Sequence, residues 1–138
     1  MSMMASFPGG FARLGWWRIG LTAAAFSLAP AVTGGMVVLA TQVFGPGVLG
    51  ANHLHGEGIA TAALVSPLVS LPIWAVIALG SAALLRLNSF GWLPAAVLGI
   101  ATFGVLARTG IGPISLPFGA ASALLYRMAL ALQRPDAF

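Results

Sequence analysis

The chain has 138 residues, of which 59% are hydrophobic and 6% are charged, and its mean hydropathy is +1.01. A soluble domain of this size could not bury so much apolar side chain, because small domains leave a large share of their surface in water. The net charge of +4 comes from six arginines that stand singly at the ends of apolar runs, so we expect no nucleic-acid partner. The absence of cysteine excludes disulfides and thiolate metal sites.

Four apolar segments follow one another along the chain, at residues 19–44, 59–85, 92–107 and 114–132. A helix rises about 1.5 Å per residue and a bilayer core is about 30 Å thick, so the first two segments are over-long and the third is short. The sequence predicts an all-α integral membrane protein, a four-helix transmembrane bundle of two hairpins over residues 19–132. Residues 1–18 and 133–138 form a cytoplasmic N-terminal segment and a cytoplasmic tail.

The first segment has an alternative interpretation as a secretory signal. Basic residues precede an apolar stretch, and Ala29-Pro30-Ala31 resembles a small-residue cleavage site. The apolar sequence continues to Phe44, which a cleaved signal would not need. We therefore favour an uncleaved first helix that bends at Pro30.

The stretch "NHLHGEG", residues 52–58, holds both histidines and one of the two acids. In an extended loop, His53, His55 and Glu57 would point to one side, because side chains alternate along an extended chain. Imidazole and carboxylate are zinc ligands, so these three residues are the candidate metal site. A fourth ligand is missing, and histidines near neutral pH could instead sense acidity. We favour a polar turn outside the membrane that binds no metal. Such a turn would lack Arg and Lys because these residues are enriched on the cytoplasmic side.

The second segment carries a possible polar helix face. Its members recur at steps of three or four residues and so share one side of a helix: Ser66, Ser70, Trp74, Ile77 and Ser81. Pro67 and Pro72 should kink this helix. A kinked helix with a serine face can line a substrate path. We favour quiet packing, in which the serines bond to upstream carbonyls of their own helix.

Small residues recur at four-residue spacing and are expected to let helix backbones approach closely. The pairs are Ala78 and Ala82, Ala95 and Gly99, and Gly119 and Ala123. They predict packing seams, either within one bundle or against another subunit. A weak internal repeat, "VLATQVFGP" at 38–46 and "VLARTGIGP" at 105–113, suggests that the two hairpins are related.

Orientation follows from the arginines. With a cytoplasmic N-terminus, five of them lie inside and only Arg108 lies outside, so both termini are predicted to be cytoplasmic. Aromatic residues beside arginines agree with a membrane–water interface. The expected interface anchors are Trp16, Trp17, Arg18, Arg86 and Trp92.

Function is constrained by what the predicted spans lack. Carriers and voltage sensors use ionisable groups within the membrane, but here only Arg127 comes close, and we expect it to snorkel to the cytoplasmic interface. We expect no catalytic residues and no cofactor, since a nucleophile with its base is not available in the spans. The prediction is an accessory or assembly subunit of a larger complex in the bacterial cytoplasmic membrane. A self-assembling pore, channel or small carrier is the main alternative, and a metal-linked protein is a third.

Overall fold

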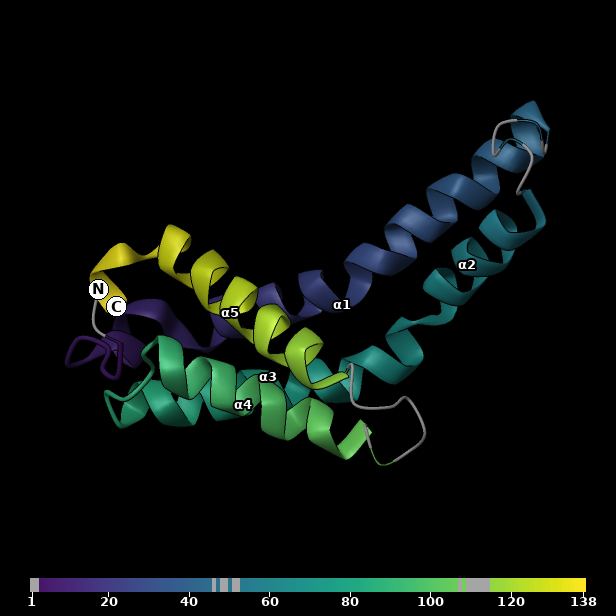
Figure 1. Cartoon of the computed structure of the whole chain (residues 1–138). Coiled ribbons are helices and arrows are strands. Elements are labelled where there is room, and N and C mark those ends of the chain that lie inside the picture. The colour runs from purple at the N-terminus through teal and green to yellow at the C-terminus, as the bar shows by residue number, and fades with distance from the viewer. Residues whose placement is uncertain (1–2, 46, 48–49, 51–52, 107, 109–114) are drawn as a thin grey trace. The chain divides into compact units, whose positions relative to one another are not determined.

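The computed structural model describes residues 3–45, 47, 50, 53–106, 108 and 115–138, and this part of the chain is helical and contains no strand (Figure 1). The elements are α1 (Gly10–Phe44), α2 (His53–Val65), α3 (Pro67–Arg86), α4 (Trp92–Leu106), α5 (Ser115–Gln133) and the short 3-10 helix η3 (Pro135–Ala137). The chain forms two compact units. We call Met1–Ala23 with Ile73–Phe138 the bundle unit and Ala24–Pro72 the hairpin unit.

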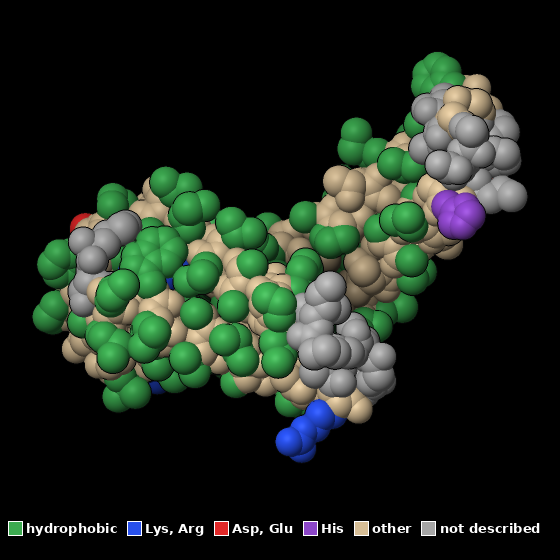
Figure 2. Space-filling model, in the orientation of Figure 1, with side chains coloured by type: hydrophobic (Ala, Val, Ile, Leu, Met, Phe, Trp, Pro, Cys, Tyr) green, Lys and Arg blue, Asp and Glu red, His purple; other side chains and the backbone are tan. Residues whose placement is uncertain are grey.

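Three of the described helices, α1, α3 and α5, are long and apolar enough to cross a membrane. The fourth apolar helix, α4, has 15 residues, or about 22 Å at 1.5 Å per residue, which is shorter than a hydrocarbon core. Hydrophobic side chains cover much of the visible surface of both units (Figure 2). This surface is compatible with a membrane protein, because a bilayer solvates such side chains and water does not.

The second predicted segment is two helices, and the prediction of one helix over 59–85 was wrong. α2 ends at Val65 and α3 begins at Pro67, with Ser66 in a turn between them. Proline suits the first turn of a helix, because an N–H there has no acceptor within the helix and proline has no N–H to leave unpaired. The backbone N–H groups of Val69 and Ser70 bond to the Ser66 carbonyl at 3.1 and 2.8 Å, so a new helix starts at this point.

α1 begins at Gly10, ahead of the predicted start at residue 19, so Trp16, Trp17 and Arg18 lie inside it. The backbone leaves the helical conformation at Gly15, where φ is 75° and ψ is 156°. At Pro30, where we expected a bend, the backbone angles stay helical. Glycine adopts a positive φ without the steric cost that other residues incur. The kink in α1 therefore falls at a glycine in the bundle unit.

α4 and α5 run antiparallel and approach backbone to backbone at two glycines. A Cβ on Gly99 would collide with the carbonyl of Gly119 and lie 2.7 Å from the Cβ of Ala123. A Cβ on Gly119 would lie 2.5 Å from the Gly99 carbonyl oxygen and 2.6 Å from the Cβ of Phe103. One turn further along, the Ser115 hydroxyl donates to the Phe103 carbonyl at 3.3 Å. We call this contact the α4–α5 seam, and it fixes the register of the two helices.

Other contacts hold the bundle unit around this seam. The Tyr126 hydroxyl donates to the Ile19 carbonyl of α1 at 2.8 Å, and its ring lies 5.8 Å from that of Trp74 on α3. Gly80 of α3 is covered by the Leu98 side chain of α4. The remaining residues of the predicted small pairs, Ala78, Ala82 and Ala95, are buried.

The hairpin unit packs through small and polar residues. Its buried α1 positions are seven residues apart and so share one helix face: Ser27, Gly34 and Thr41. A Cβ on Gly34 would collide with the Ala60 carbonyl of α2 and lie 2.9 Å from the Cβ of Ala63. Ala60 is the one buried hydrophobic residue among the described residues of this unit. The hairpin is held by close backbone approach, with its large side chains turned outward.

The α4–α5 seam predicts different outcomes for two glycines of the same helix. Gly99→Ala places a methyl group against the α5 backbone, and overpacking of this kind costs about 1–3 kcal/mol. Gly104→Ala meets only the Leu116 side chain at 3.5 Å, so it should be neutral or stabilise by up to about 1 kcal/mol. Unfolding in detergent measures both, and equal stability of the two variants would contradict the seam.

Candidate functional site

Arg127 of α5 is the largest fully buried side chain in the described part of the chain, with an exposed fraction of 0%. Its guanidinium carbon lies 4.2 Å from the Trp92 ring centroid and 4.9 Å from that of Phe138. Its Nε donates to the Phe90 carbonyl at 3.1 Å. We call these three aromatic residues with Arg127 the arginine cage.

The α4–α5 seam explains why Trp92 meets Arg127. Trp92 begins α4, two turns before Gly99, and Arg127 lies just over two turns after Gly119. In an antiparallel pair whose glycines are opposed, these positions face each other. Phe90 precedes α4, and its ring lies 5.9 Å from that of Phe138, which closes the other side of the cage.

The cage provides hydrogen-bond acceptors for only part of the guanidinium group. Nη1 and Nη2 are buried and have no hydrogen-bond partner in the part of the chain that the structure describes. A hydrogen bond from a charged group contributes about 1.5–3 kcal/mol, and each cation–π contact about 0.5–2 kcal/mol. These contacts offset much of the several kcal/mol that burial of an ion costs. Within the described part of the chain, they leave the N–H groups of both Nη atoms without an acceptor.

Both terminal segments of the chain lie next to the residues that form the cage. The Met3 carbonyl accepts from the Leu93 N–H at 3.0 Å, and the Ser6 N–H donates to the Asn88 carbonyl at 3.1 Å. Arg13 donates to the Asp136 carbonyl, which ties α1 to the segment that contains η3. The N-terminal segment therefore packs on the α3–α4 turn, next to the residues that form the cage.

A groove of about 210 Å³ lies beside the cage. Its walls are apolar and come from α4, α5 and η3: Trp92, Met128, Ala131, Leu132 and Pro135. Trp92 is half-buried and belongs both to the groove and to the cage. The Trp92 side chain therefore connects this apolar groove with the Arg127 guanidinium.

A second groove, of about 350 Å³, adjoins the predicted interface anchors. Trp16 and Arg86 line it together with Leu79, Ala82, Ala83 and Leu87. The Arg86 guanidinium lies 4.5 Å from the Phe11 ring centroid and 5.6 Å from that of Trp16. Trp17 is 76% exposed, and Arg18 is half-buried. Three of the five predicted anchors thus take part in two aromatic–arginine contacts, Trp16 with Arg86 and Trp92 with Arg127.

The serine face of the predicted second helix is split by the break at Ser66. In the hairpin unit, the Ser70 and Ser27 hydroxyls lie 2.8 Å apart and hydrogen-bond to each other. In the bundle unit, Trp74, Ile77 and Ser81 of α3 are buried. Packing at these positions agrees with the favoured interpretation, but the expected bonds to upstream carbonyls of the same helix do not form. Ser70 pairs with Ser27 of α1, and the hydroxyls of Ser66 and Ser81 have no hydrogen-bond partner among the described residues.

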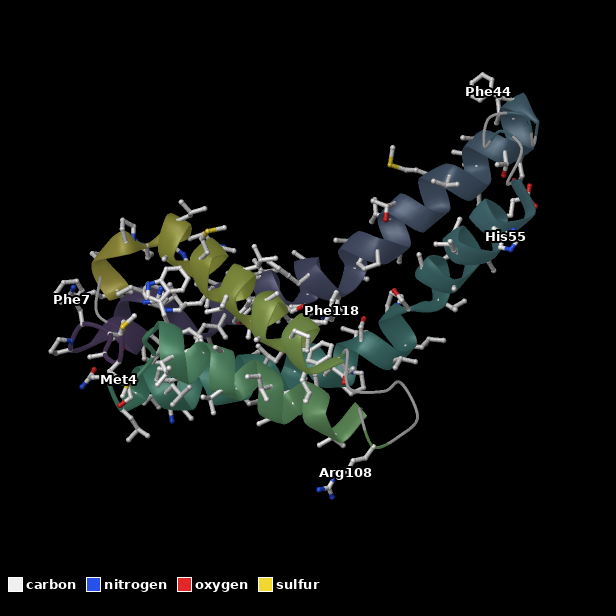
Figure 3. All side chains as sticks on the ribbon, in the orientation of Figure 1. Met4, Phe7, Phe44, His55, Arg108 and Phe118 are labelled. Carbon is white, nitrogen blue, oxygen red and sulfur yellow. The ribbon has the colours of Figure 1, made fainter. Side chains whose placement is uncertain are left out.

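The histidine segment is helical from His53, whereas both the metal hypothesis and the favoured polar turn placed it in a loop. In a helix, positions 53 and 57 share a face, and position 55 points elsewhere. His55 is exposed at the start of α2 (Figure 3). Among the described residues, no three metal-ligating side chains come together, and the His53 side chain lies outside that description.

Sequence reasoning missed the arginine cage. Arg127 was expected to snorkel to the interface, but it is enclosed, because the seam sets Trp92 opposite it and Phe138 folds back over it. The signal in the sequence was an arginine six residues inside the end of an apolar helix, with a tyrosine beside it. The second copy of the suspected repeat and its turn lie mostly outside the described residues.

Comparison with known proteins gives no match: no family model, no curated protein and no solved structure is similar to this chain. Function therefore has to be inferred from the geometry of the chain itself. The features available for that inference are the arginine cage, the two grooves and the outward-facing side chains of the hairpin unit.

The arginine cage predicts that Trp92 contributes more to stability than its exposed neighbour. Trp92→Leu removes the closest ring from the guanidinium and should lower the free energy of unfolding by about 1–3 kcal/mol. Leu93→Ala, at a mostly exposed position, should change it by less than about 0.5 kcal/mol. Chemical denaturation in detergent compares the two, and a smaller loss for Trp92→Leu would contradict the cage.

Proposed function

We propose that this chain is a multi-pass membrane protein that acts as an accessory or assembly subunit of a larger membrane complex. Its four spans would be α1, the α2–α3 segment, α4 and α5, with both termini in the cytoplasm of a bacterium. The asymmetry of five arginines against Arg108 supports this orientation. The chain would work by packing against other helices and would carry out no reaction of its own.

The observation that carries the proposal is an outward stripe on the hairpin part of α1. Large apolar side chains recur at steps of three or four residues and are 46–67% exposed: Leu28, Val32, Met36, Leu39 and Val43. Such spacing is typical of the apolar face with which one helix packs against another. The opposite face, with Ser27, Gly34 and Thr41, already packs within the hairpin.

The outward stripe favours a protein partner because the hairpin has little core of its own. A single buried alanine among its described hydrophobic residues leaves dispersion contacts unmade within the unit. Lipid can cover apolar side chains, but a helix that interlocks with the stripe gains packing contacts that mobile lipid chains do not provide. An apolar transmembrane helix of another subunit is the partner that fits this surface.

A homo-oligomeric pore or small carrier is the alternative. The same outward stripe could pair with its counterpart on a second copy of the chain. The packed positions of Ser70 and Ser81 speak against a pore through the monomer. A homo-oligomer would therefore have to place its path between copies.

The proposed topology predicts a specific labelling pattern. Because the chain has no cysteine, each of Ser2→Cys, His53→Cys, Ser89→Cys and Gly110→Cys gives a single reactive site. An impermeant maleimide added outside intact cells should label positions 53 and 110 only. Labelling of position 2 or 89 from outside would contradict the four-span topology.

The outward stripe predicts where a partner binds. A photo-cross-linking amino acid at Met36 or Leu39 should give adducts with one foreign membrane protein, recovered in a fixed ratio to this chain from native membranes. The matched control is Val97 of α4, which is 56% exposed and should give lipid adducts. Adducts with a second copy would instead support the homo-oligomer, and lipid adducts at all three positions would contradict both.

A further inference from the structure

The guanidinium of Arg127 is a buried cation, and the described residues supply no acceptor for its two Nη atoms. Within the same described part of the chain, neither of the two acids, Glu57 and Asp136, hydrogen-bonds to them. Burial of a guanidinium in this state is costly, whereas an added oxyanion would remove the cost. The unmet requirement is therefore a negatively charged group with at least two oxygen acceptors.

The surroundings of Arg127 indicate what kind of molecule carries that group. The neighbouring groove has apolar walls, and Ala131, one helical turn beyond Arg127, lines it on the same face of α5. Trp92 lines the groove, contacts the guanidinium and is only half-buried, so the apolar groove lies next to the cation. A ligand with an anionic head and an apolar body matches this combination of charge and surface.

We infer that Arg127 binds the phosphate of an anionic membrane lipid, with the apolar part of that lipid in the groove beside Trp92. The planar guanidinium is weakly hydrated and binds phosphate through two parallel N–H bonds, which Nη1 and Nη2 are free to make. The net charge of +4 favours an anionic over a zwitterionic lipid. This site depends on the proposed membrane location but on neither the accessory role nor the partner.

The full chain in a neutral detergent tests the inference. Short-chain phosphatidylglycerol, phosphatidylcholine and inorganic phosphate are titrated separately, and the thermal midpoint and the bound mass by native mass spectrometry are measured. Phosphatidylglycerol should bind at one equivalent and raise the midpoint, with phosphatidylcholine weaker. Inorganic phosphate that raises the midpoint as much as the lipid would overturn the lipid as the natural source.

Variants locate the site. Arg127→Lys keeps the charge and loses the planar fork, so phosphatidylglycerol binding should weaken by about tenfold. Arg134→Gln and Arg86→Gln each remove one charge at exposed positions and are the controls for general attraction. Binding that falls equally in the controls, or stays unchanged in Arg127→Lys, would overturn the inference.

A groove variant keeps the inference testable should changes at Arg127 prevent folding. Leu132 is 78% exposed and lines the groove, so Leu132→Trp should fill the groove and leave the core intact. Lipid binding should weaken in this variant, and unchanged lipid binding would contradict the groove as the site. A lipid that binds the isolated chain normally while cross-linking finds no partner would leave this inference standing and remove the accessory role.

Discussion

The contact of α4 with α5 at Gly99 and Gly119 is the constraint on which the bundle unit depends. Neither position accommodates a Cβ, so the two backbones can approach only in this register. The same register brings Ser115 to the Phe103 carbonyl at one end and Trp92 to Arg127 at the other. In an apolar surrounding, burial of apolar area does little to drive helices together, so close packing and a few polar contacts have to do so.

The two units use this principle differently. The bundle unit adds large interlocking side chains around its seam, including Ile19, Ile77, Tyr126 and Leu130, which are fully buried. The hairpin unit has only the close contact of Gly34 with Ala60 and the hydrogen bond between two serines, and its large side chains point outward. This difference is why we connect the hairpin unit with a partner and the bundle unit with a ligand. A buried arginine can bind a ligand specifically only where the surrounding structure is rigid enough to hold its side chain in place.

Much of the helical framework could be predicted from the sequence, because long apolar runs and small-residue spacing are local signals. The bounds of α4 and α5 lie within a residue of their predicted segments, and the predicted pairs include both glycines of the seam. The break at Ser66 was missed because proline is compatible with a kinked helix and with a new one. The helical start of α2 was missed because polarity indicates exposure and not conformation. The cage could not be predicted, since it joins Phe90, Trp92, Arg127 and Phe138 through tertiary register.

The distance between Phe103 and Gly119 tests the central claim, the backbone contact of α4 with α5, most directly. Magic-angle-spinning NMR on the chain in lipid bilayers, with phenylalanine and glycine labelled with carbon-13, reports short carbon–carbon distances. The account predicts a cross-peak between the Phe103 Cβ and the Gly119 Cα, identified by its disappearance in Phe103→Leu. Helical chemical shifts for both segments without that cross-peak would contradict the seam and, with it, the register that forms the arginine cage.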